Sequence, residues 1–116
     1  MLYAGENDLA SGKTPEDVLA DFQRLVDLVL GELPQTRICF LAIKPSPCRW
    51  EIWPQMQRAN ALIRDFTTAD PRLGYIDIVP LMLDAAGEPR TELYSDNLHM
   101  TPEGYRLWVP VIREYL

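Results

Sequence analysis

Apolar residues recur at helical spacing in the first part of the chain. The first helical segment opens at Thr14-Pro15-Glu16-Asp17, where Thr14 is typical of an N-cap and Pro15 of the first helical position. Apolar side chains then follow every three or four residues until Gly31, which we expect to end the helix. The stripe consists of Val18, Leu19, Phe22, Leu25, Val26, Val29 and Leu30.

Continuous apolar runs of strand length separate the helical segments. Residues 37–43 form one such run, as expected for a strand that is buried on both faces, and a second strand is expected at about residues 74–79. Residues 1–4 resemble the end of a further strand. Gly5-Glu6-Asn7-Asp8 is then expected to form a turn.

Two further helices complete the pattern. One is expected over about residues 54–66, after a Pro-rich loop, and the last opens at Thr101-Pro102-Glu103 with the same N-cap chemistry as the first. Pro110 predicts a kink or an early end of that last helix. This alternation of strands and helices predicts an α/β fold with a parallel sheet.

Composition narrows the class of protein. The chain has 116 residues, of which 47% are hydrophobic and 24% charged, so residues 1–116 are expected to form one globular domain. A net charge of −6 without any basic cluster argues against nucleic acid and anionic membrane surfaces as partners. No apolar run reaches the roughly 20 residues of a membrane span. Cys39 and Cys48 match no metal or redox spacing and are expected to be reduced thiols.

A candidate acid–base pair precedes the last helix. Asp96 stands three residues before His99, the only histidine, and could hold one ring nitrogen while the other acts as a general base. The alternative is a surface histidine beside a turn aspartate. A metal site is not expected, because zinc needs three or four ligands and no second histidine exists.

The segment around Asn7 offers a second candidate. Gly5, Asn7 and Asp8 follow a predicted strand end, which is where ligand sites lie in open α/β sheets. The Asn7 amide could stabilise a developing oxyanion. Alternatively, an asparagine in a tight turn satisfies only its own backbone.

Together the two segments resemble the SGNH (GDSL-type) ester hydrolases. A Gly-x-Asn-Asp turn lies about ninety residues before an Asp-x-x-His motif, and residues 96–105 (DNLHMTPEGY) are similar to the family's fifth block and the helix after it. The segments 43–47 and 75–78 also resemble members that act on small acyl esters. The resemblance implies a three-layer α/β/α, flavodoxin-like fold.

The resemblance also implies roles for individual residues. His99 would be the general base, Asp96 its orienting partner and Asn7 an oxyanion-hole donor, with Gly5 and Asp8 shaping the turn that presents Asn7. The substrate would be a small acyl ester, and no cofactor is implied. Ser46 and Tyr94 are candidates for a substrate-binding loop, although packing onto the scaffold is the alternative for both.

The family's earlier blocks are missing from this sequence. The sequence contains neither the Gly-Asp-Ser block with the nucleophile nor the family's second block, whose glycine N–H is another oxyanion donor. We therefore expect an N-terminally truncated domain that lacks about 60–80 residues. Ser11, Ser46 and Ser95 do not lie in a nucleophile elbow. The chain alone is therefore expected to be nearly inactive. Its uncovered sheet edge is expected to favour self-association or an N-terminal complement.

Two other functions are compatible with parts of the pattern. One is a non-catalytic binding or interaction module built on the same fold. The other is a nucleotide binder, because Ser11-Gly12-Lys13-Thr14 resembles the end of a P-loop. Two features argue against a P-loop. Asn7 stands where a P-loop requires its earlier glycine, and Pro15 makes Thr14 better suited to cap a helix.

Overall fold

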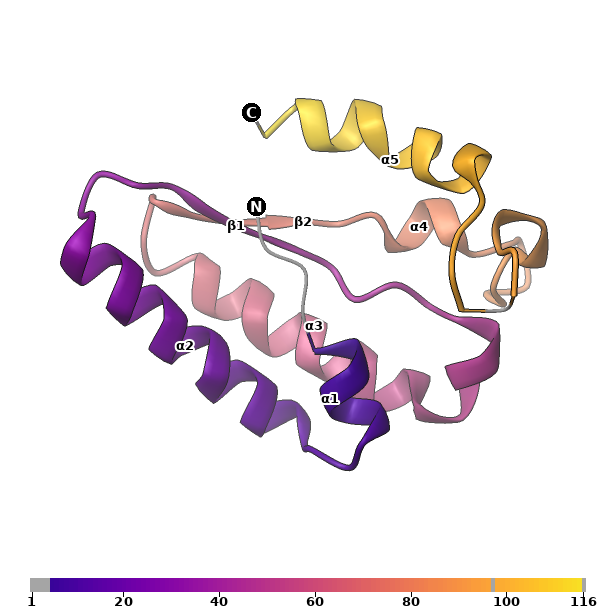
Figure 1. Cartoon of the computed structure of the whole chain (residues 1–116), viewed down its shortest axis with the longest axis horizontal. Coiled ribbons are helices and arrows are strands. Elements are labelled where there is room, and N and C mark those ends of the chain that lie inside the picture. Colours follow the sequence, from indigo (N-terminus) through magenta and orange to yellow (C-terminus); the bar gives the residue numbers. More distant parts are fainter. Residues whose placement is uncertain (1–4, 97, 116) are drawn as a thin grey trace.

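Helices cover both faces of a short parallel sheet in the protein, here a computed structural model (Figure 1). The structure describes residues 5–96 and 98–115, apart from the side chains of Glu6 and Asn7. The strand end that the sequence predicts at residues 1–4 lies outside the described residues.

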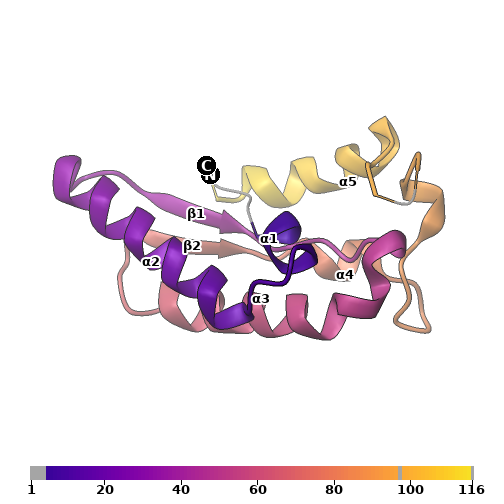
Figure 2. The ribbon, with the colours of Figure 1, turned by 60° about the horizontal axis from the view of Figure 1, so that its bottom comes forward.

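The elements alternate along the chain as the sequence predicts. Helices α2 and α3 lie on one side of the sheet and α5 lies on the other (Figure 2). The fold is therefore of the α/β class with a parallel sheet. In order, the elements are α1 (Glu6–Ala10), α2 (Pro15–Glu32), β1 (Ile38–Leu41), the 3₁₀ helix η1 (Pro47–Ile52), α3 (Trp53–Thr67), β2 (Leu73–Ile76), α4 (Val79–Met82), the 3₁₀ helix η2 (Thr91–Leu93) and α5 (Pro102–Arg113).

Strand β1 is buried on both of its faces. It pairs in parallel with β2, from Ile38 opposite Leu73 to Leu41 opposite Ile76, and all four of its residues are buried. Successive side chains of a strand point to opposite faces. Accordingly, Phe40 packs with α2 and α3, whereas Leu41 packs in the cluster under α5.

The α2–α3 side of the sheet is held by aromatic contacts. The Phe22 ring of α2 meets Phe40 of β1 and Phe66 of α3 edge-on, with centroid distances of 5.1 and 5.9 Å. Thr14 caps α2 as predicted: its hydroxyl accepts the Asp17 N–H at 3.1 Å, and Asp17 accepts the Thr14 N–H at 3.0 Å. This reciprocal pair fixes the start of α2.

The α5 side of the sheet has its own cluster. Trp108 of α5 is 7% exposed, and its indole N–H lies 3.2 Å from the Met82 sulfur of α4. Gly104 lets the first turn of α5 approach the chain before it, because a Cβ there would lie 2.8 Å from the Leu93 carbonyl oxygen. This packing holds the residues that precede α5 against the sheet.

Two local expectations are wrong, and one of two alternatives is excluded. Gly5–Asp8 is not a simple turn: the Gly5 carbonyl accepts the Leu9 N–H at 3.0 Å and opens the short helix α1, which the buried Leu9 anchors to the core. Gly31 does not end α2, which continues to Glu32 and stops before Pro34. Of the two outcomes expected at Pro110, the early end does not occur, since α5 runs to Arg113, and the kink stays a prediction.

The two glycines that flank α1 provide a test of packing at its start. Gly5 and Gly12 have φ values of 100° and 102°, but a Cβ at Gly5 would lie 2.9 Å from Val18 and 3.1 Å from Ile43, whereas nothing lies within 4 Å at Gly12. Both alanine variants carry backbone strain of about 1–3 kcal/mol. We expect Gly5→Ala to lower the free energy of unfolding by about 1 kcal/mol more than Gly12→Ala, as measured by urea denaturation. Equal losses would contradict the close packing of Gly5.

Candidate active site

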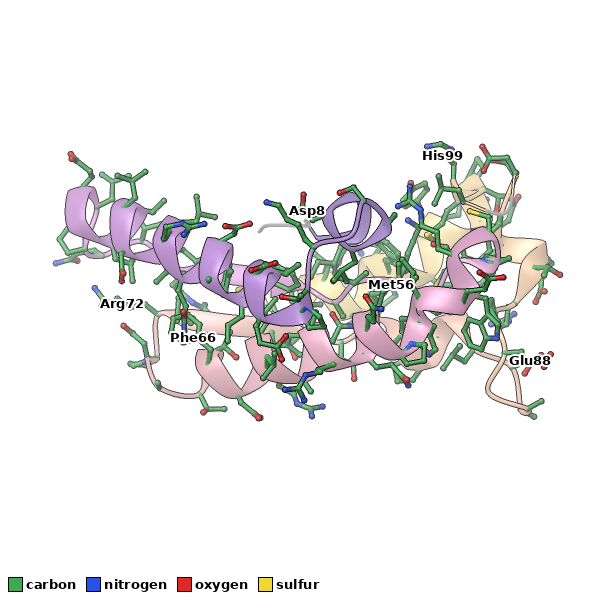
Figure 3. The ribbon with its side chains drawn as sticks, turned by 90° about the horizontal axis from the view of Figure 1, so that it is seen from below. Asp8, Met56, Phe66, Arg72, Glu88 and His99 are labelled. Atoms are coloured by element: carbon green, nitrogen blue, oxygen red, sulfur yellow. The ribbon has the colours of Figure 1, made fainter. Side chains whose placement is uncertain are left out.

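The candidate site lies in the loops beyond the carboxyl ends of the two strands. Strand β1 leads into residues 42–46, and β2 leads through Asp77 and Ile78 into α4. The loop that carries Asp96 and His99 follows, between η2 and α5. Figure 3 labels His99 at one rim of the molecule. In parallel α/β sheets this end is where ligands bind.

Asp96 and His99 form the hydrogen-bonded pair that the sequence predicts. The Nδ1 atom of His99 lies 2.8 Å from Oδ2 of Asp96. With its proton on Nδ1, the neutral ring donates to the carboxylate and keeps the Nε2 lone pair available. The Nε2 atom has no hydrogen-bond partner among the described residues, and the His99 side chain is 71% exposed. The pair can therefore accept a proton from a group that approaches from solvent.

The Asp96 carboxylate is stabilised in its charged form. The hydrogen bond from the His99 ring contributes most, followed by the backbone N–H groups of His99 and Leu98, and together they lower the pKa of Asp96 to about 2. These N–H groups lie 2.6 and 3.0 Å from Oδ1. Asp96 is therefore an anion at neutral pH, which is the state that orients a histidine base.

Backbone contacts close the loop around this pair. The Ser95 N–H donates to the His99 carbonyl at 2.8 Å, and the Thr101 N–H donates to the Leu93 carbonyl at 2.8 Å. Tyr94 and Met100 form an antiparallel bridge. The loop thus begins and ends at neighbouring points, which holds Asp96 close to His99.

Two polar side chains tie the site loops to the scaffold. The Tyr94 hydroxyl donates a buried hydrogen bond to the Pro45 carbonyl, which joins the His99 loop to the loop after β1. Asn60 of α3 accepts the Ile43 N–H at 2.8 Å and donates to the Ile43 carbonyl at 3.1 Å. Asn60 was not predicted from the sequence. The only sequence feature that indicates it is a polar residue next to Ala59 on the buried face of a predicted helix.

The segment around Asn7 occupies the start of α1, and the Asn7 side chain lies outside the described part of the structure. Gly5 is buried with a positive φ, and Asp8 is partly buried. The Asp8 carbonyl accepts the N–H groups of Ser11 at 3.2 Å and Lys13 at 3.0 Å, so it shapes the turn after α1. The role of Asn7 as an oxyanion donor stays a prediction.

Ser46 and Tyr94 are both buried, at 1% and 7% exposure. Ser46 directly precedes η1, and Tyr94 packs in the cluster under α5. In this structure both residues contribute to the scaffold of the site loops. Their contact with a substrate stays a prediction.

Other kinds of site have little support in the described residues. Within residues 5–96 and 98–115, no group of three or more His, Cys, Asp and Glu side chains is placed to hold a metal ion. Across the same residues, none of the helices has the length and apolar character to cross a membrane. Cys39 and Cys48 are free thiols, the first buried and the second exposed.

The family is shown by the sequence itself. Residues 1–107 match the model of the GDSL-like lipase/acylhydrolase family, so the chain belongs to this family. No curated protein sequence matches the chain.

Solved structures agree on the fold. A protein from Streptococcus pneumonia that is described as a putative platelet activating factor is similar, with a TM-score of 0.88 at 20% identity, over 98% of this chain and 57% of that one. The esterase domain of the ZfL2-1 ORF1 protein from the zebrafish ZfL2-1 retrotransposon gives a TM-score of 0.73 at 22% identity, over 97% and 64%. The chain thus spans less than two thirds of either neighbour.

The Asp96–His99 pair predicts a pH-dependent contribution to stability. Because its folded-state pKa of about 2 lies below the ordinary 3.8, Asp96 stabilises the fold above about pH 4, and this effect fades as the pH falls towards 2. We therefore expect Asp96→Asn to lower thermal stability near neutral pH but not near pH 2. In ¹⁵N NMR spectra, the neutral His99 ring should also lose its preference for the Nδ1–H tautomer. The exposed Asp65→Asn is the control, and an unchanged tautomer would contradict the pair.

The Tyr94 hydroxyl is expected to stabilise the site loop. Tyr94→Phe keeps the ring but removes the hydrogen bond to Pro45, so the free energy of unfolding should fall by about 1–3 kcal/mol. Tyr105→Phe is the matched control, since Tyr105 is 48% exposed and its change should stay within about 0.5 kcal/mol. Urea denaturation measures both, and equal stability of the two variants would argue against the contact.

Proposed function

We propose that this chain supplies the acid–base half of a serine acylhydrolase site that acts on a small acyl ester. The hydrogen bond of 2.8 Å between Asp96 and His99, with Nε2 left open to solvent, is the observation that carries the proposal. Asp96 holds the ring, and Nε2 of His99 takes the proton of an attacking serine hydroxyl. The same nitrogen then protonates the leaving alcohol and activates water for deacylation.

The attacking serine comes from outside this sequence. Ser11 donates its hydroxyl to the Asp8 carbonyl at 2.9 Å, and Ser95 donates to the backbone carbonyl of His99 at 3.1 Å, not to its ring. Ser46 is almost fully buried, at 1% exposure. None of the three is presented to Nε2 of His99. The 116-residue polypeptide alone therefore leaves the acid–base pair without its nucleophile.

The docking surface for the missing part is the uncovered edge of the sheet, on the far side of the strand that the sequence predicts to end at residue 4. Among the described residues β1 pairs only with β2, so the expected strand and the missing part extend the sheet on the other side of β1. Beside it, a cavity of about 120 Å³ opens between α1, α2 and β1, lined by Gly5, Asp8, Val18, Asp21, Phe22, Leu25 and Phe40. An added strand with apolar side chains extends the sheet and fills this cavity. Without it, the same edge favours self-association.

This function predicts activity only after N-terminal extension. The 116-residue chain should hydrolyse 4-nitrophenyl acetate at a rate that His99→Ala does not change. A longer polypeptide, extended with the coding sequence that precedes Met1 and carrying a Gly-Asp-Ser block, should turn the ester over. In that form His99→Ala should reduce kcat by about 10³-fold or more.

The control is the extended polypeptide with the serine of that block changed to alanine, which should be as inactive as the short chain. Turnover by the 116-residue chain that His99→Ala abolishes would show a nucleophile within it. An inactive extended polypeptide that still binds the ester would instead support a non-catalytic binding module.

A further inference from the structure

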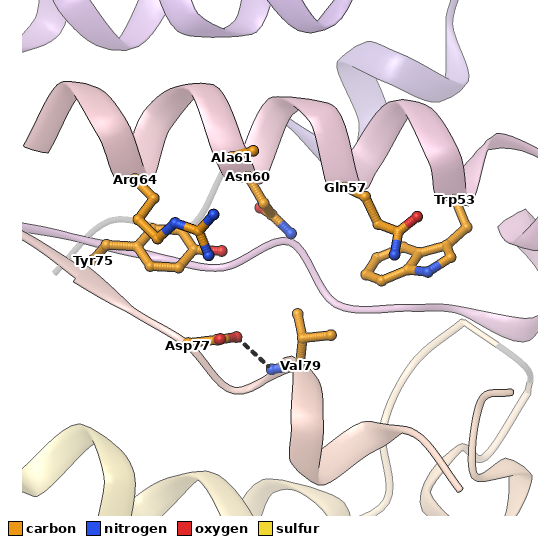
Figure 4. A pocket seen from close by; sticks show the side chains of 8 residues that line it. All are labelled: Trp53, Gln57, Asn60, Ala61, Arg64, Tyr75, Asp77 and Val79. Carbon is orange, nitrogen blue, oxygen red and sulfur yellow. Dashed lines mark hydrogen bonds between the residues drawn. The ribbon is translucent and has the colours of Figure 1, made fainter. Parts of the chain in front are cut away.

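A small pocket lies between α3 and the outer edge of β2, apart from the Asp96–His99 loop (Figure 4). Its volume is about 180 Å³, below the roughly 300–1,000 Å³ of pockets for drug-sized ligands. A ligand that fits it is therefore small. The residues that matter for recognition are Trp53, Gln57, Arg64, Tyr75, Asp77 and Val79.

Regular secondary structure positions the walls of this pocket. Trp53, Gln57 and Arg64 are spaced by four and seven residues, so they share one face of α3. Tyr75 belongs to β2 and Asp77 follows two residues later, which places both on the same face of the extended chain. Sites on helices and strands are held more rigidly than sites on loops, so the pocket is pre-formed.

Two opposite charges face the pocket without neutralising each other. Arg64 comes from α3 and Asp77 from the end of β2 (Figure 4). Among the described residues, neither side chain belongs to an ion pair with the other or with a third group. Within the part of the chain that the structure describes, the Asp77 carboxylate accepts only the Val79 N–H, at 3.1 Å, through one of its oxygens. Its second oxygen and the whole Arg64 guanidinium remain available to a ligand.

Uncharged groups complete the lining. The Gln57 amide and the Tyr75 hydroxyl make no hydrogen bonds with the described residues, and burial together with the nearby Asp77 raises the pKa of Tyr75, so its hydroxyl stays a donor. Trp53 is only 5% exposed and stacks on Trp50 with a centroid distance of 5.9 Å, which makes it a fixed apolar wall. Val79 adds a second apolar surface.

We propose that this pocket binds a free α-amino acid with a small aliphatic side chain. Arg64 and Gln57 receive the ligand's carboxylate, and Asp77 receives its ammonium group. The aliphatic side chain packs against Trp53 and Val79. A dipolar ligand satisfies both unpaired charges at once, whereas a simple anion or cation leaves one of them facing a group of like charge. This site is independent of the ester hydrolase function.

Three probes with the same aliphatic part distinguish a dipolar ligand from a simple anion or cation. L-leucine carries both charges, 4-methylpentanoate lacks the ammonium group and isopentylamine lacks the carboxylate. In ¹H–¹⁵N NMR titrations of the 116-residue chain up to about 10 mM, we expect L-leucine to give saturable shifts at Gln57, Arg64 and Asp77. Each of the other two probes should bind at least about tenfold more weakly.

Variants test the two charges. Arg64→Gln and Asp77→Asn should each weaken L-leucine binding about tenfold. Neither change threatens the fold, because Arg64 is exposed and asparagine keeps an acceptor for the Val79 N–H. Arg58→Gln is the matched control: Arg58 is also on α3, but it pairs with Glu16 of α2 at 2.8 Å and should leave binding unchanged.

Two results would overturn the proposal. The first is the absence of saturable shifts at these residues with L-leucine. The second is binding of 4-methylpentanoate as tight as that of L-leucine, accompanied by tighter binding in Asp77→Asn, which would mark a site for simple carboxylates.

Discussion

The burial of β1 on both faces is the constraint on which the rest of the structure depends. A strand whose side chains are apolar on each side can leave water only if a layer of structure covers each face. Phe40 requires α2 and α3 on one side, and Leu41 requires α4, α5 and the chain between them on the other. The parallel pairing with β2 then fixes which ends of the strands point towards the same rim.

The same packing determines the position of the candidate active site. Asp96 and His99 form a local pair that needs only one turn of chain, but that turn must be placed relative to the sheet. Tyr94 places it through the Pro45 carbonyl, and Asn60 fixes the backbone of Ile43 two residues earlier. Buried polar groups such as these are costly when unpaired, so the site loops are held in a defined arrangement.

Membership of the GDSL-like lipase/acylhydrolase family connects this geometry with chemistry. The described residues hold a histidine that is oriented by a carboxylate, but the three serines serve turns or lie buried. Among the described residues β1 pairs only with β2, and an apolar cavity lies between α1, α2 and β1. This arrangement supports the proposed role of the chain as the acid–base half of a hydrolase site.

The sequence by itself determined the α/β class, the cap of α2 at Thr14 and the Asp96–His99 pair. Each depends on interactions within a few residues: a helical stripe, a capping box or a contact from residue i to i+3. Only the tertiary structure decided that Asn60 clamps Ile43 and that Tyr94 reaches Pro45. It alone also brought Arg64 and Asp77 to one pocket. These contacts join residues on different elements, and no local pattern encodes them because their partners meet only after the helices have packed on the sheet.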